Sequence, residues 1–518
     1  MKHTILPVLA AATLVSLPVS ASADWPQWRG PDRNGVVSGE VLLPEEFPEG
    51  YEVEKIWEFA GVPSDHYGGH GSVSIAAGRV FLSVVWHRDE PTESRRIDGD
   101  VMSALGYRGT NSIPEEIVAE MEQERMNLPR RLRGKELDEY AEKWVEEHLD
   151  EKTQLSLGSW VVSRFRKGKA AIPIEVYGKL LEARNTTFPG QAEMEEWVRA
   201  QGFDPAIEEE VIAAVPNTEK VANDVILCLD SATGEEVWRF EVPGYPSGRS
   251  SSSTPAIAEG KVYAALSEHL YCIDAGSGSE IWRSPLEGRR GPASSPLVAE
   301  GRVFLQENRL TAFDAETGEV LWFNKEVQRS NPSPAWWNGL VLCNGSKDFF
   351  AIDPESGETR WKVPGGGDAT PVVSGDVAIV HSRLEGKNLV AYRLSPTGAE
   401  EMWSLDYLAR RYDSSPVVHE GSVYHLGSNR HLCLDLETGE PRWDMPAQSS
   451  ISSPIVAGDR LLVYENRGGF LGMIQADPED YSHRGRAKVG ALYCASPALV
   501  GDRLFLRTKD SVICYRLP

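Results

Sequence analysis

Short apolar runs alternate with tight polar turns over most of the chain, and the alternation repeats about every 40 residues. One repeat shows the pattern: a strand is expected from Pro296, followed by strands at 303–306, 310–313 and 320–323. Apolar and polar residues alternate with a period of two in these runs, and Gly and Asn mark the turns between them. Four short antiparallel strands per repeat are typical of one blade of a β-propeller.

Two recurring phrases mark each repeat. In the first, Asp is followed by Gly four residues later and by Trp eight residues later, as in Asp314, Gly318 and Trp322. The Asp side chain accepts hydrogen bonds in a tight turn, and the Gly adopts a positive φ there. The second phrase is a Ser/Thr-Pro pair that opens the innermost strand, where a Pro is tolerated. These pairs begin at Thr254, Ser295, Ser333, Thr370, Ser415, Ser453 and Ser496.

The phrases predict an all-β fold: an eight-bladed beta-propeller with a helical insertion domain. An eighth opening, around Ser72, joins the seven Ser/Thr-Pro pairs. The last repeat ends after its third strand, and an extra strand around Trp57 precedes the first repeat. We therefore expect this strand to complete the last blade, which removes an exposed sheet edge. The tryptophans expected to dock neighbouring blades, buried between them, are Trp57, Trp238, Trp282, Trp322, Trp361 and Trp443.

These phrases resemble the pyrroloquinoline-quinone (PQQ) repeat family, in which Asp-x-x-Thr-Gly-x-x-x-Trp is the blade-docking motif. The family includes quinoprotein alcohol dehydrogenases, PQQ-binding-like secreted propellers and the propeller of the outer-membrane assembly machine. The resemblance therefore implies the fold and leaves the function open. The residues from Asp24 to Pro31 are also similar to the start of secreted propellers of this family. Two repeats depart from the motif: Trp403 stands one residue late, and the seventh repeat has no such Trp.

The chain divides into five predicted parts. Residues 1–23 have a basic start, an apolar stretch and a small-residue end, which predicts a cleaved signal peptide without a lipobox. We therefore expect a periplasmic or secreted protein. Residues 24–50 are an N-terminal segment. Propeller strands are expected in residues 51–87, a helical insertion within the first blade in 88–222, and the rest of the propeller in 223–518.

The predicted insertion carries apolar residues at helical spacing, for example Leu137, Ala141 and Trp144. The alternative is a disordered acidic insert. In a four-stranded meander, the loop before the first strand and the loop joining strands two and three leave the same face. The insertion should therefore rise from the face that carries the mouth of the channel. Helices are expected to begin near Ser112 and to cover 137–149, 173–185, 191–201 and 205–214.

The charge and apolar content of the chain limit the classes of partner that it can bind. The chain has 53 basic and 77 acidic residues, a formal net charge of −24, which disfavours nucleic acid as a partner. After residue 23, no apolar run approaches the length of a transmembrane segment. Four of the six cysteines occupy one strand position where other repeats have Ala, so we expect buried apolar fillers rather than disulfides. These four are Cys228, Cys272, Cys433 and Cys514.

The loops before the innermost strands are basic, although the protein is acidic. A ring of guanidinium groups over the channel would suit a small anionic ligand that carries carboxylate or phosphate. The alternative is that these arginines bind carbonyls of neighbouring blades and acids of the insertion. The histidines of the first loop are more often polar loop residues than metal ligands, and no metal site is predicted. The candidate ligand-binding residues are Arg249, Arg290, Arg329, Arg411, His66, His70 and Asp413.

No catalytic motif singles out a reaction, since H-E-x-x-H, G-x-S-x-G and Walker sequences are absent, and whether the protein is an enzyme stays open. The first hypothesis is an exported binding or scaffold protein with a protein or glycan partner. The resemblance implies a second, a periplasmic PQQ-dependent alcohol or sugar dehydrogenase. Its cofactor would be PQQ with calcium, but the chain lacks the adjacent Cys-Cys pair of the alcohol-oxidising branch. A third is a lyase or hydrolase on acidic sugars, with His66 or His70 as the base.

Overall fold

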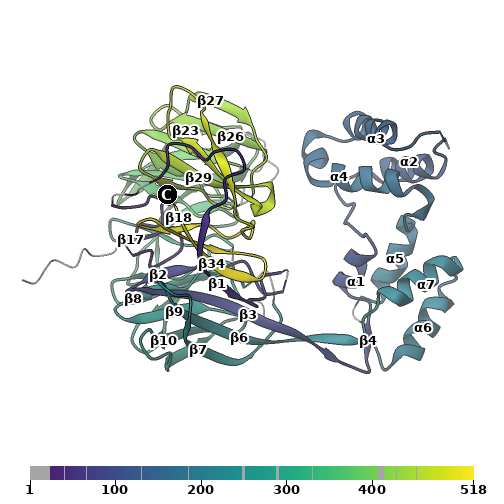
Figure 1. Ribbon diagram of the computed structural model, residues 1–518, viewed down its shortest axis with the longest axis horizontal. Coiled ribbons are helices and arrows are strands. Elements are labelled where there is room, and N and C mark those ends of the chain that lie inside the picture. Colours follow the sequence, from purple (N-terminus) through teal and green to yellow (C-terminus); the bar gives the residue numbers. More distant parts are fainter. Residues whose placement is uncertain are drawn as a thin grey trace, which may run out of the picture.

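The computed structural model describes residues 24–517, apart from residues 40, 42, 66, 130, 185, 248–250, 288–290, 329–330, 407–413, 428 and 451. The described chain is mostly β, with eight four-stranded antiparallel sheets and one group of helices (Figure 1). The expectation of a mainly β fold is thereby confirmed. The sheets are numbered first to eighth in chain order.

Each sheet begins with a three-residue strand, and this strand lies at one edge of its sheet. The first sheet contains β2 (Ser74–Ala76), β3 (Arg79–Pro91), β6 (Thr218–Asp230) and β7 (Glu236–Gly244). The second contains β8 (Ala256–Ala258), β9 (Lys261–Ala265), β10 (His269–Asp274) and β11 (Glu280–Pro285). The third contains β12 (Leu297–Ala299), β13 (Arg302–Glu307), β14 (Arg309–Asp314) and β15 (Val320–Asn324). The fourth contains β16 (Ala335–Trp337), β17 (Leu340–Asn344), β18 (Asp348–Ile352) and β19 (Thr359–Pro364).

The other four sheets repeat this order. The fifth contains β20 (Val372–Ser374), β21 (Val377–Leu384), β22 (Lys387–Ser395) and β23 (Gly398–Leu405). The sixth contains β24 (Val417–His419), β25 (Ser422–Leu426), β26 (Arg430–Asp435) and β27 (Pro441–Pro446). The seventh contains β28 (Ile455–Ala457), β29 (Arg460–Glu465), β30 (Phe470–Gln475) and β31 (His483–Lys488). The eighth contains β32 (Ala498–Val500), β33 (Arg503–Arg507), β34 (Ser511–Arg516) and, from the N-terminal side of the chain, β1 (Glu54–Ala60).

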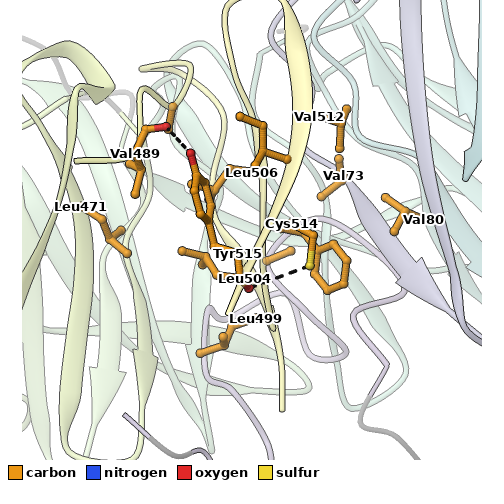
Figure 2. Packing of buried hydrophobic residues seen from close by; sticks show 14 of the residues in the cluster. Val73, Val80, Leu471, Val489, Leu499, Leu504, Leu506, Val512, Cys514 and Tyr515 are labelled. Carbon is orange, nitrogen blue, oxygen red and sulfur yellow. Dashed lines mark hydrogen bonds between the residues drawn. The ribbon is translucent and has the colours of Figure 1, made fainter. Parts of the chain in front are cut away.

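The eighth sheet joins the two ends of the repeat region. Strand β1 pairs with β34, and Trp57 lies opposite Cys514. Figure 2 shows residues of this sheet between Val73 of the first sheet and Leu471 of the seventh. The hydroxyl of Tyr515 donates to the carbonyl oxygen of Val489 at 3.1 Å. One hydrophobic cluster thus connects the seventh, eighth and first sheets.

The Ser/Thr-Pro phrases connect neighbouring sheets through hydroxyl groups. The backbone N–H of Ser72 donates to Thr254 Oγ1 at 2.9 Å, and the N–H of Thr254 donates to Ser295 Oγ at 3.0 Å. The N–H of Ser496, in the eighth sheet, donates to Ser72 Oγ in the first at 2.8 Å. The same bond recurs from Ser295 to Ser333, from Ser333 to Thr370 and from Ser415 to Ser453. We call these residues the Ser/Thr ring.

Tryptophans connect the sheets again at their outer strands. The indole N–H of Trp282 donates to the carbonyl oxygen of Ala315 in the next sheet at 3.1 Å. Trp403 also donates to the next sheet, because it lies opposite Ala391 as Trp322 lies opposite Ala312, despite its late place in the sequence. The other donors are Trp57, Trp238, Trp322, Trp361 and Trp443. Among the seven, Trp238 and Trp322 are only half-buried.

The helices lie beside the sheets, at the end of a long ribbon formed by β3 and β6 (Figure 1). This ribbon pairs as far as Pro91 and Thr218, well beyond the predicted strands, and Lys220 binds Asp89 along it at 2.9 Å. None of the described helices is long and apolar enough to cross a membrane. The helices are α1 (Gly99–Ala104), α2 (Glu115–Met126), α3 (Lys135–His148), α4 (Glu151–Lys167), α5 (Ile174–Glu182), α6 (Gln191–Ala200) and α7 (Pro205–Ala214).

The helical segment has its own hydrophobic interior. One cluster surrounds Tyr177 and Leu180 of α5, and a second surrounds Trp144 of α3 and Phe165 of α4. Both clusters contain residues of this segment only, between Ile97 and Val215. The sequence analysis did not predict α1 or α4, because α1 is short and α4 mixes polar residues with its apolar ones.

The six cysteines are free thiols, and all except Cys494 are buried. Burial raises the pKa of the Cys228, Cys272 and Cys514 thiols to about 12. These thiols are therefore neutral and act as apolar packing groups, as Cys514 does in Figure 2.

Candidate functional site

Most of the candidate mouth residues cannot be placed. Arg249, Arg290, Arg329, Arg411, His66 and Asp413 lie outside the described residues. Of the predicted ligand-binding group, the structure describes His70. The proposed ring of guanidinium groups at the mouth therefore stays a prediction.

His70 is packed into the interface between the first and eighth sheets. Its side chain is buried, its backbone N–H donates to Ser252 Oγ at 2.9 Å, and its ring lies edge-on to Tyr493 at 5.4 Å. Its neighbour Gly71 lies against the backbone of Ser253, where a Cβ would meet the carbonyl oxygen. These contacts fix the loop and give His70 a structural role at the mouth.

The side chain of Arg507 binds the same loop, a role that was not predicted from the sequence. Its buried guanidinium donates to Ser64 Oγ at 2.8 Å and to the carbonyl oxygens of Gly71, Gly68 and Pro63 at 3.0–3.2 Å. Burial lowers the pKa of Arg507 to about 9, so the group is still charged at neutral pH. The sequence carries no repeated signal for this role, because Arg507 is an isolated arginine at the end of the second strand β33.

Equivalent positions of other second strands carry further buried polar groups. Gln306 Nε2 donates to the carbonyl oxygen of Asn344 at 2.8 Å, and Asn344 Nδ2 donates to the carbonyl oxygen of His381 at 2.9 Å. The rings of His381 and His425 then meet, with Nε2 and Nδ1 3.3 Å apart. The sheets are thus joined by side-chain hydrogen bonds near the mouth, from the third sheet to the sixth.

Three buried histidines gather in the fifth and sixth sheets. Burial lowers the pKa of His381 and of His431 to about 4. Burial also lowers the pKa of His425 well below its ordinary value, and the neighbouring His381 and His431 lower it as well. All three are therefore neutral at neutral pH. His431 bonds to Ser449 Oγ and to the hydroxyl of Tyr481. Among the described residues, no group of three His, Cys, Asp or Glu side chains is placed to hold a metal ion.

The N-terminal residues 24–37 contact the first strands of several sheets. We call them the channel segment, because the propeller prediction places these strands around a central channel. Trp25 forms a backbone bridge with Ile75 of β2, and the N–H of Ile257 in β8 donates to the carbonyl oxygen of Pro26 at 2.8 Å. On another side of the channel, Val37 donates to the carbonyl oxygen of Val456 in β28 at 2.8 Å. These first strands pair with their own sheets on one edge, so the channel segment binds their free edges.

Two arginines of the channel segment extend toward the Ser/Thr ring. Arg29 Nη2 donates to the carbonyl oxygen of Pro416 in the sixth sheet at 2.6 Å. Arg33 donates through Nη1 to the carbonyl oxygen of Pro296 at 2.6 Å and through Nη2 to that of Ser295 at 3.0 Å, in the third sheet. All three acceptors directly precede the first strands of their sheets. This placement could not be predicted from the sequence, because Pro416 and Pro296 are hundreds of residues away from the arginines that bind them.

A pocket of about 730 Å³ lies where the β3–β6 ribbon meets the loops of the first sheet. Tyr67, Lys220 and Tyr245 lie on its wall, together with Asp98 of the helical segment. Lys220 Nζ lies 4.4 Å from the centre of the Tyr67 ring. Tyr67 and Tyr245 lie in loops that lead into first strands, so the ribbon lies beside these loops. The arrangement can bind a polar or aromatic group.

The described residues do not fit PQQ and calcium in the channel. Its edges at β2, β8 and β28 are paired with the channel segment, and the charged groups there are the cationic Arg29 and Arg33 rather than calcium-binding carboxylates. No chemical step is therefore derived through that cofactor.

A family model described as outer membrane protein assembly factor BamB matches residues 222–385 and 386–516, more than half of the chain. Among solved structures, BamB from Moraxella catarrhalis is similar at 14% identity, over 57% of this chain and 93% of that chain, with a TM-score of 0.48. A quinohemoprotein alcohol dehydrogenase from Comamonas testosteroni is similar at 15% identity, over 58% and 72%, with a TM-score of 0.43. No curated protein sequence matches significantly.

Proposed function

The chain belongs to the family of outer membrane protein assembly factor BamB, and on this premise we propose that it is an exported scaffold that binds another protein. The match confirms the resemblance to PQQ-repeat propellers. The family description names an assembly factor, which supports a protein partner over a glycan or a small anion at the mouth. Export rests on the sequence of residues 1–23, which lie outside the described residues.

The helical segment carries this proposal. It has two hydrophobic clusters of its own and stands beside the sheets on the β3–β6 ribbon (Figure 1). A segment that is neither needed to close a sheet nor packed into the core of the sheets is available to contact a partner. The pocket at its base, walled by Tyr67, Lys220 and Tyr245, offers aromatic and charged side chains of the kind that anchor protein interfaces.

We also propose that the eight sheets are the blades of one closed propeller, with the helical segment as an insertion domain in the first blade. The bond from Ser496 to Ser72 and the cluster shared by the seventh, eighth and first sheets support closure. The ribbon supports domain boundaries at its end, after Pro91 and before Thr218, inside the predicted range 88–222.

Site-specific photo-crosslinking in the native exporting cell tests the partner surface. A crosslinking amino acid replaces Tyr140 in α3 or Tyr245 at the pocket, and the control replaces Met445 on the sixth sheet. These residues are similarly exposed, at 38%, 42% and 38%. We expect one discrete protein adduct from Tyr140 or Tyr245 and none from Met445. Adducts of equal yield at all three positions would count against the helical segment as the binding surface.

A second experiment addresses the dehydrogenase alternative. The purified protein is incubated with PQQ and calcium, and dye-linked oxidation is followed over a panel of alcohols and sugars. We expect no turnover above that of a heat-denatured sample. Saturable turnover would overturn the scaffold proposal, and it would also require the channel segment to move, because that segment pairs with the inner edges of the sheets.

A further inference from the structure

Two arginine side chains of the channel segment are buried, and neither has an acidic partner among the described residues. Arg29 is 1% exposed and Arg33 is 2% exposed. Neither forms an ion pair with any carboxylate of the described residues, although the chain as a whole has 77 acidic residues. Burial lowers the pKa of each guanidinium to about 9, so both keep their charge at neutral pH. The channel therefore contains two buried positive charges.

The hydrogen bonds of these arginines are incomplete. Arg29 uses Nη2 for the carbonyl oxygens of Pro416 and Asn34, while its Nε and Nη1 are buried and have no partner among the described residues. Arg33 uses Nη1 and Nη2, and its buried Nε likewise has no described partner. Three buried charged donors thus remain open within one short segment.

Burying a charged group is costly unless it is paired and its hydrogen bonds are made. The carbonyl oxygens of Pro296, Ser295 and Pro416 provide partial negative charge only. A net negative group would complete the open donors and offset both charges. An apolar side chain at either position would avoid the free-energy cost of burying a charge. The guanidinium groups of Arg29 and Arg33 therefore need an interaction that offsets this cost.

We propose that a small anion binds at the channel segment with Arg29 as its main ligand. Arg33, which binds the third sheet, supplies a second buried positive charge in the same segment. The ligand is a halide or the oxygen of a carboxylate or inorganic phosphate. Bound there, it would complete the attachment of the channel segment to the third and sixth sheets. The proposal does not depend on the scaffold function or on the mouth arginines, which belong to other loops.

Bromide is the first probe, because it can be located directly. Crystals of the wild-type protein are soaked in sodium bromide, and anomalous difference maps are calculated near the bromine edge. We expect a peak within hydrogen-bond distance of Arg29 Nε or Nη1. Ordered water on all three open nitrogens, with no anomalous peak, would overturn the proposal.

Thermal melting measures the linkage in solution. Sodium bromide, acetate and phosphate are titrated separately at constant ionic strength, with a bulky sulfonate salt as the balance. For the anion that binds, we expect Tm to rise with the logarithm of the anion concentration, by about 2–3 °C at roughly 100 times its Kd. Arg29→Gln should abolish this rise, and Arg33→Gln should weaken it.

The matched control is Arg360→Gln, since Arg360 is an exposed arginine on β19 that binds Asp353. It should keep the wild-type anion dependence. An anion effect that is equal in Arg29→Gln and Arg360→Gln would contradict the site and indicate a general salt effect. If Arg29→Gln does not fold, Arg29→Lys keeps the charge, and the bromide map of the wild-type protein decides the question.

Discussion

At the scale of single residues, the Asp-Gly-Trp phrase forms a turn in one sheet and packs it against the tryptophan of the preceding sheet. Asp314 Oδ1 accepts from the backbone N–H groups of Glu316 and Thr317, which sets the turn. Gly318 follows with φ of +75°, and the Trp282 ring from the preceding sheet covers it. A side chain at Gly318 would be strained by its φ and would also collide with the indole. The spacing in sequence therefore encodes both a turn and a docking surface.

Truncation of a docking indole should destabilise the protein. Trp282→Ala should lower the free energy of unfolding by about 3–5 kcal/mol, because it removes a buried aromatic and the bond to Ala315. Chemical denaturation followed by tryptophan-independent circular dichroism measures it. The control Leu321→Ala changes an exposed apolar residue and should cost far less. Equal losses for the two variants would refute the docking role.

The buried histidines should make stability depend on acid. The pKa of His431 is about 4 in the fold and the ordinary value is 6.5, so the unfolded chain binds the proton first as pH falls. Stability is then lost between pH 6.5 and 4, by up to about 1.4 kcal/mol per pH unit for each such histidine. In His431→Gln, unfolding free energies at pH 7, 6 and 5 should fall less steeply than in the wild type.

The matched control for this pH series is His419→Gln, at the half-buried end of β24. Asp224, whose buried carboxyl has its pKa raised to about 6, acts in the opposite direction but is present in every variant. Its contribution therefore cancels in the comparison. If His431→Gln and the wild type show the same slope, His431 is not a source of the acid sensitivity.

Residue roles were readable from the sequence only where they repeat. The tryptophan spacing is local and recurs. Arg507, Arg29 and Arg33 each bind backbone carbonyls contributed by remote segments, and an isolated arginine in a sequence is usually a surface residue. His70 was predicted as a candidate ligand-binding residue, which stays a prediction, and the structure shows how its loop is packed against Ser252 and Tyr493.

At the scale of elements, the Ser/Thr-Pro pair has a second role beyond starting a strand. Its hydroxyl accepts the backbone N–H of the neighbouring first strand, a donor that would otherwise be buried without a partner. The role of the Pro follows from the sequence, but the role of the hydroxyl does not. The hydroxyl meets its N–H donor only when neighbouring sheets pack side by side.

A conservative pair of variants separates the hydroxyl from the volume it fills. Ser295→Ala removes the acceptor of the Thr254 N–H and should cost about 1–3 kcal/mol of unfolding free energy. Ser295→Thr keeps the acceptor and should be nearly neutral, as Thr occupies the same position at Thr254 and Thr370. Native-state hydrogen exchange of the Thr254 amide should accelerate in the Ala variant only. Unchanged protection in that variant would contradict the bond.

The channel segment shows the limit of pattern-based prediction for elements. Residues 24–37 have no regular periodicity, and they form few regular strand pairs. Their contacts are with the edges of β2, β8 and β28, which are far apart in sequence and adjacent only around the channel. The helices of the insertion were easier, since α3, α5, α6 and α7 each carry an apolar stripe.

At the scale of the whole molecule, repetition made the β part predictable, and the insertion was located by where the repeat breaks. The length of the β3–β6 ribbon was not predictable. Its outer half consists of polar pairs such as Asp89 and Lys220, which resemble loop sequence. From the sequence, the mouth could be described only by the charges of its loops. Most of its candidate residues lie outside the described residues.

The insertion should be separable from the sheets. Pro91 and Thr218 face each other at the end of the ribbon, so an Asn-Gly turn can replace residues 92–217 and close a two-residue hairpin. No hydrophobic cluster of the sheets includes residues of the removed segment. The shortened protein should therefore keep its β-rich circular dichroism spectrum and melt within about 4 °C of the full chain, roughly 3 kcal/mol at this size.

The removed piece gives the complementary test. Residues 92–217 expressed alone should show a helical spectrum and cooperative melting, since both clusters of the segment are contained in it. A Trp144→Ala variant should lose that cooperativity, whereas Glu147→Ala, at an exposed position of the same helix, should keep it. If the shortened chain aggregates while the isolated segment stays unfolded, the two parts form one cooperative unit. The insertion would then stabilise the sheets. Binding of a partner alone would no longer explain why the helical segment stands beside them.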